Sequence, residues 1–271
     1  MIVLLGPAVT GAKLPSVRNA AYSKVIQRLS LRCKASQNLA AESLHSHGGP
    51  LHRVSQRVRR HQNGRMGKLA CTASSNGKAS GPVIVVDNYD SFTYNLCQYL
   101  GDLGCEHIVL KNDEKTVEEI REMQPRGILV SPGPGRPEDS GISLQIVQEL
   151  GPELPVFGVC MGHQCIGQVF GGRVVRAPGG AMHGKTSLVY HNNTSLLKGL
   201  QNPFQAARYH SLVIDKDSCP EDLEVTAWTE DGVIMGVQHK QFPHIQGVQF
   251  HPESVITSEG RTIVQNFIDC L

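Results

Sequence analysis

Acidic residues are almost missing from the first 80 residues, which hold thirteen lysines and arginines but a single acid, Glu42. Tyr22 is the only aromatic residue there, and no apolar period persists. A segment with so little apolar surface cannot offset the entropy lost on ordering. The composition therefore predicts that residues 1–80 are disordered, in a chain of 271 residues whose net charge is only +2.

Arg-rich, Ser-rich and acid-poor N-termini are typical of organellar transit peptides. We therefore expect residues 1–80 to be a transit peptide, for plastids or alternatively mitochondria. A basic tail that binds nucleic acid through Arg57, Arg59 and Arg60 is the other alternative, but the acid depletion spans the whole segment rather than this patch. No stretch approaches the roughly 20 apolar residues of a membrane span, so no membrane contact is expected.

The chain also lacks the usual metal-binding motifs. Its eight cysteines include no CxxC pair, and the histidines fall in separate segments without HExxH spacing. The glycine-rich turn at residues 132–135 follows neither the GxxxxGK[ST] nor the GxGxxG phosphate-binding pattern. We therefore expect no metal and no cofactor, and most of the cysteines should be reduced core residues.

From Pro82 onward, β-branched apolar runs alternate with helical stretches. This alternation predicts an α/β domain over residues 81–271, with an open, mostly parallel sheet flanked by helices and an antiparallel portion after Gly172. The final helix should begin near Ser258 as its N-cap. The expected strands are 83–86, 107–110, 127–130, 155–159, 173–176, 185–190, 204–209, 223–229, 233–239 and 245–249. The expected helices are 92–103, 117–123, 141–150, 161–170 and 258–270.

A buried strand runs into Gly-x-Cys-x-Gly around Cys160, and a helix follows at once. Such a strand–turn–helix resembles a nucleophile elbow with cysteine in place of serine. The start of a helix favours a thiolate, and the carboxyl end of a parallel strand is where ligands bind. By itself the pattern is equally compatible with a small buried cysteine.

A second segment supplies a base, because His251 follows another expected strand and Glu253 lies two residues later. Histidine can take the thiol proton and return it to leaving ammonia. In extended backbone the Glu253 side chain would lie on the same side and orient the imidazole. A surface histidine beside a solvated glutamate is the simpler alternative for this pattern alone.

Taken together, these segments resemble the class I (triad) glutamine amidotransferases over nearly all of residues 82–271. The matching segments are residues 87–96 (DNYDSFTYNL), 131–135 (SPGPG), 158–164 (GVCMGHQ), 209–212 (YHSL) and 249–254 (QFHPES). The resemblance implies that Cys160 is the nucleophile, His251 the base and Glu253 its orienting partner. These residues would hydrolyse L-glutamine to glutamate and ammonia through a thioester.

The resemblance also implies residues that bind glutamine. Gly133 and Gly135 would line the glutamine and oxyanion pocket, the latter together with the N–H group of Met161, where the family usually has leucine. The positions that hold glutamine are matched by Gln164, Ser211 and Leu212.

Within this family, the sequence is most similar to the small (β) subunits of anthranilate synthase, in a plant, plastid-targeted form. That similarity implies an anthranilate synthase large (α) subunit as partner in a hetero-oligomer. The amidotransferase of aminodeoxychorismate synthase shares nearly every motif and stays an alternative. It resembles a fused polypeptide in plants, whereas this chain ends after its expected last helix. The carbamoyl-phosphate synthase small subunit and a non-catalytic glutamine sensor are more distant alternatives.

Overall fold

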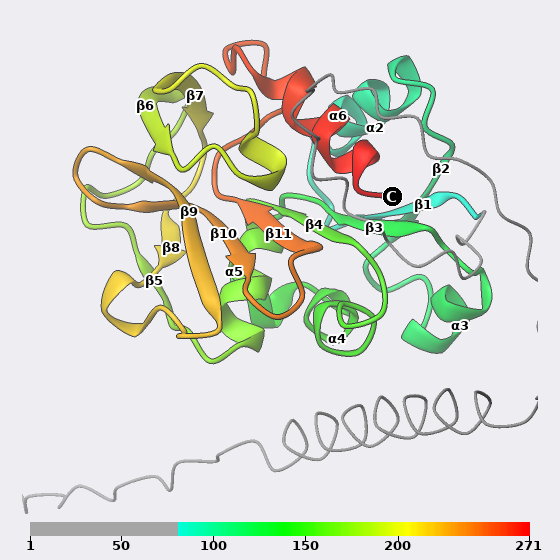
Figure 1. Ribbon diagram of the computed structural model, residues 1–271. Helices are drawn as coiled ribbons and strands as arrows, with labels where there is room; N and C mark the ends of the chain where they lie inside the picture. The colour runs from blue at the N-terminus through cyan, green and yellow to red at the C-terminus, as the bar shows by residue number, and fades with distance from the viewer. Residues whose placement is uncertain (1–80) are drawn as a thin grey trace, which may run out of the picture. The chain divides into compact units, whose positions relative to one another are not determined.

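The computed structural model describes residues 81–271, so the predicted transit peptide lies outside the described residues. A nine-stranded sheet crosses this part of the chain in the order β2-β1-β3-β4-β11-β10-β9-β6-β7 (Figure 1). Its strands are β1 (Val83–Asp87), β2 (His107–Lys111), β3 (Gly127–Val130), β4 (Val156–Val159), β6 (Lys185–His191), β7 (Phe204–Arg208), β9 (Leu223–Thr229), β10 (Ile234–His239) and β11 (Ile245–Val248).

Helices cover both faces of the parallel half of the sheet (Figure 1). One face carries α2 (Thr93–Asp102) and α6 (Gly260–Asp269), and the other carries α3 (Val117–Glu122), α4 (Ser143–Glu149) and α5 (Met161–Val169). Because strand side chains alternate between faces, β1 serves two separate apolar cores. Val83 and Val85 pack with residues of α2 and α6, whereas Ile84 and Val86 pack with residues of α3, α4 and α5.

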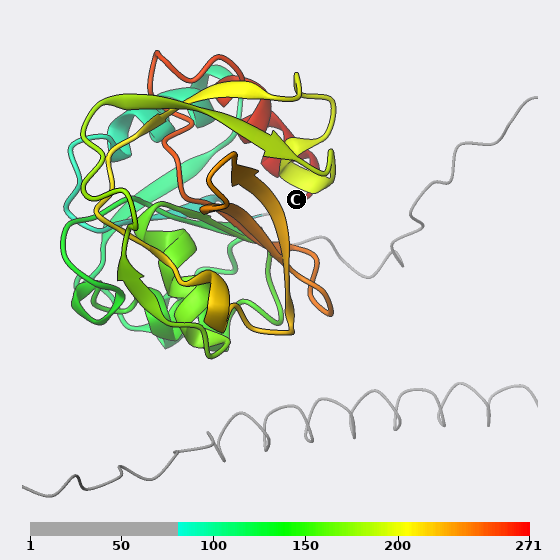
Figure 2. The same ribbon diagram turned by 90° about the vertical axis from the view of Figure 1, so that its left-hand side faces the viewer.

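The predicted α/β class is confirmed, with one change in the C-terminal portion. The sequence pattern groups β11 with the antiparallel strands, but β11 pairs in parallel with β4 and antiparallel with β10. It is therefore the strand at which the sheet changes direction. Figure 2, seen from the side of β6 and β7, shows the antiparallel strands beyond it. Within residues 81–271, no helix is both long and apolar enough to cross a membrane.

A second sheet has only two strands, β5 (Val174–Arg176) and β8 (Leu212–Ile214), which pair antiparallel. The sequence predicts a strand at 173–176 but none at 212–214. Each strand is three residues long, too short to show a period of its own.

The start of the last helix differs from the prediction. α6 begins at Gly260 with Glu259 as its N-cap, and no side chain caps it. The backbone N–H of Ser258 instead donates to Gln205 O at 3.3 Å. Gly260 lies against Pro252, and a Cβ there would stand 1.7 Å from the Pro252 carbonyl oxygen. Tertiary packing of this glycine, rather than a cap residue, therefore decides where the helix begins.

Candidate active site

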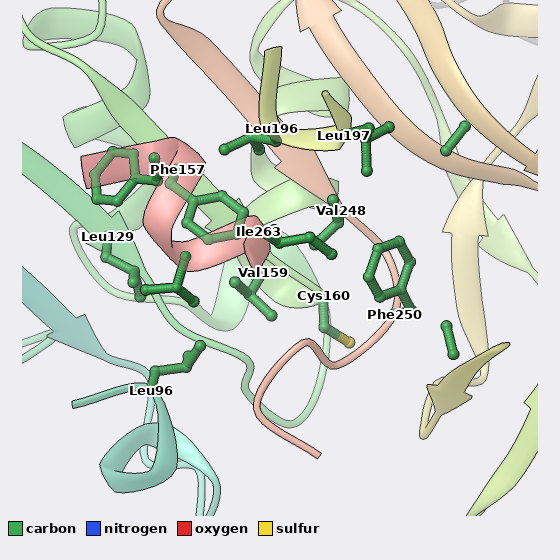
Figure 3. Packing of buried hydrophobic residues seen from close by; sticks show 14 of the residues in the cluster. Leu96, Leu129, Phe157, Val159, Cys160, Leu196, Leu197, Val248, Phe250 and Ile263 are labelled. Carbon is green, nitrogen blue, oxygen red and sulfur yellow. The ribbon is translucent and has the colours of Figure 1, made fainter. Parts of the chain in front are cut away.

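Cys160 stands between β4 and α5, in the sharp turn that the sequence predicts. Its φ of 51° lies in the left-handed region, which is strained for a residue with a side chain. The Cys160 N–H donates to Val248 O of β11 at 2.8 Å, which holds this conformation from outside the turn. In Figure 3 Cys160 lies at the margin of the apolar cluster, near Val159 and Phe250.

Two glycines allow the elbow to close. A Cβ on Gly158 would stand 2.4 Å from the carbonyl carbon of Gly162, and a Cβ on Gly162 would stand 2.4 Å from Val130 O. Backbone atoms cannot retreat as a flexible side chain could. The Gly-x-Cys-x-Gly pattern is therefore a requirement for packing the first turn of α5 onto β3 and β4.

His251 and Glu253 follow β11, the parallel neighbour of β4, so the sheet brings them to the elbow. The His251 Nδ1 donates to Glu253 Oε1 at 2.6 Å, and both residues are buried. The expectation of an extended link is wrong. The Ser254 N–H donates to His251 O at 3.3 Å, so a tight turn with Pro252 at its second position brings the two side chains together.

The proton positions on the imidazole follow from these contacts. A carboxylate only accepts, so Nδ1 carries the hydrogen that faces Glu253. Within residues 81–271, the buried Nε2 has no hydrogen-bond partner of ordinary geometry. Cys160 nevertheless lies close enough to the imidazole ring to interact with it. Burial lowers the pKa of His251, but the charge of Cys160 and the contacts with Cys160 and Glu253 outweigh it. The pKa of His251 is raised well above 6.5, which favours an imidazolium facing Cys160.

Two aromatic rings, which the sequence interpretation does not assign to the site, confine the imidazole. Phe92 and Tyr209 meet His251 edge to face, with ring centroids 5.7 Å and 5.2 Å away. The two rings also contact each other at 5.2 Å. Both residues belong to segments that match the family, and that position was the one feature of the sequence that could have assigned them to the site.

Gly133 and Gly135 lie in the turn after β3. A Cβ on Gly133 would stand 2.5 Å from Asn88 Cβ, and Gly135 has a φ of +84°. Gly135 lines an open cavity of about 520 Å³, but Cys160 is not among the lining residues. The oxyanion and glutamine-binding roles of these glycines stay predictions.

The other predicted binding residues lie in α5 and at the start of β8. Met161 is the first residue of α5, where N–H groups have no acceptor within the helix. The Gln164 Nε2 donates to Leu212 O at 3.1 Å and to Gln249 Oε1 at 3.3 Å. Ser211 is exposed beside Leu212. Their roles in holding glutamine also stay predictions. Gln249 is the further residue that sequence analysis missed, a fully buried amide between an apolar strand and His251.

The buried His163 makes the fold sensitive to acid. Burial lowers the pKa of His163 to about 3, so the folded chain keeps it neutral while the unfolded chain protonates it near 6.5. Its contribution to stability is therefore complete above pH 6.5 and is lost as the pH falls toward 3. We expect the free energy of unfolding to drop by about 2 kcal/mol between pH 7 and pH 5 from this group alone.

Urea denaturation of the wild type and of a His163→Met variant at both pH values measures this difference. The variant should lose about 2 kcal/mol less than the wild type on acidification. A His183→Met variant changes an exposed histidine and should behave like the wild type. The same pH dependence in the His163→Met variant would contradict the prediction.

Comparison with known families agrees with this geometry. Residues 84–270 match the family model described as glutamine amidotransferase class-I. The chain therefore belongs to the class I glutamine amidotransferase family.

Individual relatives narrow this assignment. The chloroplastic anthranilate synthase beta subunit 2 of Arabidopsis thaliana is 66% identical over 194 residues, covering 70% of this chain and 71% of that protein. The chloroplastic beta subunit 2 of Oryza sativa subsp. japonica is 65% identical over 191 residues, covering 69% and 70%. A solved structure of a candidate GMP synthase subunit from Thermoplasma acidophilum has a TM-score of 0.61 at 26% identity, covering 70% of this chain and 93% of its own.

These comparisons confirm the predicted resemblance to glutamine amidotransferases and, within them, to plant anthranilate synthase small subunits. The predicted fold class, enzyme class and plastid location are confirmed with them, since both plant relatives are chloroplastic.

Proposed function

We propose that the chain hydrolyses L-glutamine at Cys160 and passes the ammonia to an anthranilate synthase large subunit, which forms anthranilate from chorismate. The observation that carries this proposal is the arrangement of Cys160, His251 and Glu253 at the carboxyl ends of two parallel neighbours, β4 and β11. The 66% identity to an anthranilate synthase beta subunit supports the choice of partner.

The first half of the reaction forms a thioester. The Cys160 thiolate attacks the side-chain amide carbon of glutamine, and the carbonyl oxygen takes up the negative charge. Protonated His251 gives its Nε2 proton to the nitrogen, the C–N bond breaks, and ammonia leaves. The N–H of Met161, one residue after the nucleophile and at the start of α5, would stabilise this negative charge.

The second half returns the enzyme to its starting state. Neutral His251 takes a proton from water, the hydroxide adds to the thioester carbon, and the thiolate leaves with the electrons of the C–S bond. Glutamate is released, and His251 is again protonated beside the thiolate. Glu253 accepts a hydrogen bond from His251 Nδ1 throughout and does not itself take up a proton.

The test mixes the chain with a plant anthranilate synthase large subunit and follows anthranilate fluorescence with glutamine as the sole nitrogen donor. We expect anthranilate from the mixture and none from either subunit alone. Glutamine hydrolysis by the chain alone should be slower than in the complex. A parallel reaction uses an aminodeoxychorismate-forming partner. Coupling to that partner only would contradict the anthranilate assignment and leave the cysteine chemistry in place.

We also propose that residues 1–80 are removed after import into plastids. Their excess of basic residues and single acid support this proposal, as does the chloroplastic location of both plant relatives. Mass spectrometry of the mature protein from chloroplasts should find an N-terminus near residue 80. A mature protein that begins at Met1 would contradict it.

A further inference from the structure

A continuous series of buried polar groups joins the end of β7 to the sulfur of Cys160. Its members are Arg208, His210, the Leu212 carbonyl, Gln164 and Gln249, and the four polar side chains are at most 3% exposed. The series contributes none of the three triad residues. Buried polar groups of this kind are costly unless each finds a partner with a defined orientation.

Arg208 determines which ring nitrogen of His210 carries the hydrogen. A guanidinium only donates, and the Arg208 Nε donates to His210 Nε2 at 3.1 Å. His210 must then carry its hydrogen on Nδ1, which donates to Leu212 O at 3.0 Å. Burial and the nearby Arg208 charge lower the pKa of His210 to about 4, so this neutral tautomer persists at pH 7.

The Leu212 carbonyl determines the orientation of the side-chain amides of Gln164 and Gln249. It only accepts, so Gln164 must turn its NH2 group toward it, and that group donates at 3.1 Å. The same NH2 group donates to Gln249 Oε1 at 3.3 Å. Gln249 therefore presents its own NH2 group on the other side, 3.5 Å from Cys160 Sγ. The reverse orientation would oppose two NH2 groups and direct an oxygen at the sulfur.

We propose that Gln249 is a positioning residue for the nucleophile: it donates an N–H to the Cys160 thiolate, in an orientation that the Leu212 carbonyl imposes through Gln164. A hydrogen bond to the charged form of a group favours that form. The bond also restrains the sulfur, which sits on the strained residue of the elbow. This inference rests on the proposed cysteine chemistry and adds a group that triad geometry does not require.

The same series ties substrate binding to the nucleophile. The Leu212 carbonyl accepts hydrogen bonds from both His210 and Gln164, so the segment 211–212 predicted to hold glutamine and the amide that faces the sulfur share one anchor. A shift of this segment therefore changes the position of the Gln249 donor to Cys160, although Leu212 begins β8 and Cys160 precedes α5.

The experiment compares Gln249→Met with Gln246→Met in the full chain. Both residues are buried glutamines of the same segment, but the Gln246 Oε1 accepts from Leu196 N, not from the site. Methionine keeps most of the volume and cannot donate. The rate of Cys160 alkylation by iodoacetamide is measured across pH, with peptide mass spectrometry to identify the modified cysteine.

We expect Gln249→Met to move the pH profile of Cys160 alkylation up by about one unit, so that the rate falls by about tenfold on the acidic limb of the profile. Gln246→Met should keep the wild-type profile. Gln164→Met, which removes only the orienting donor, should shift the profile in the same direction by less. In glutamine hydrolysis by the complex, Gln249→Met should lower kcat more than it raises KM.

An unchanged alkylation profile in Gln249→Met, or an equal shift in Gln246→Met, would overturn the inference. If Gln249→Met does not fold, the Gln164→Met profile decides: a wild-type profile there overturns the orienting series. These outcomes are separate from the proposed function. Failure to couple to an anthranilate synthase large subunit would leave the alkylation result intact, and an unchanged profile would leave the coupling intact.

Discussion

A Cys160→Ser variant, assembled with an anthranilate synthase large subunit, should make no anthranilate from glutamine but normal amounts from added ammonium. Serine keeps the size of the side chain, but its hydroxyl does not ionise beside His251 as a thiol does. We expect the glutamine-dependent rate to fall by at least about 10³-fold. Ammonium bypasses the missing step because ammonia is consumed on the other subunit.

Cys165→Ser is the matched control. Cys165 lies in the same helix, is fully buried, and its sulfur lies 3.4 Å from Ser140 Oγ, which a serine can replace as a hydrogen-bonding group. Both the glutamine-dependent and the ammonium-dependent rates should stay near the wild type. Loss of the ammonium-dependent rate in an assembled Cys160→Ser complex would contradict the division of labour between the subunits.

Glu253→Gln should lower kcat/KM for glutamine by about 10³-fold without unfolding the chain. The buried Glu253 oxygen accepts from His251 Nδ1 at 2.6 Å, which leaves Nε2 free to exchange a proton with Cys160. An amide can present an N–H group to Nδ1 instead. That contact would place the imidazole hydrogen on Nε2, in the tautomer that cannot accept the thiol proton.

The pH profile of this variant distinguishes the electrostatic role from simple packing. Glu253 is one of the groups that raise the pKa of His251, so its removal lowers that pKa. The decline of activity at high pH, where the imidazolium is lost, should therefore begin at a lower pH than in the wild type. Glu259→Gln, a change at the partly exposed N-cap of α6, is the control and should keep the wild-type profile. A Glu253→Gln variant with wild-type kcat/KM would refute the assigned role.

The parallel half of the fold was readable from sequence because its central strands β1, β3, β4 and β11 are buried on both faces. β1 and β3 are largely continuous apolar runs, and the helices between the strands show apolar residues at helical spacing. The C-terminal half was harder. β8 has three residues and lies in a separate sheet, and the first turn of α6 depends on a glycine packed against Pro252. Neither feature has a local pattern that sequence analysis can find.

The sequence by itself determined which residues could do the chemistry, because a cysteine between two glycines after a buried strand, and a histidine followed by a glutamate, are local features. Only the tertiary structure decided that they act together. The parallel pairing of β4 with β11 brings Gln249 and His251 to Cys160, across 89 positions of chain in the case of Gln249. Sheet register sets these distances through hydrogen bonds between strands that are remote in sequence. The residues adjacent along the chain carry no information about that pairing. The orientation of Gln249 depends on a carbonyl of yet another segment, so it too is a property of the folded chain alone.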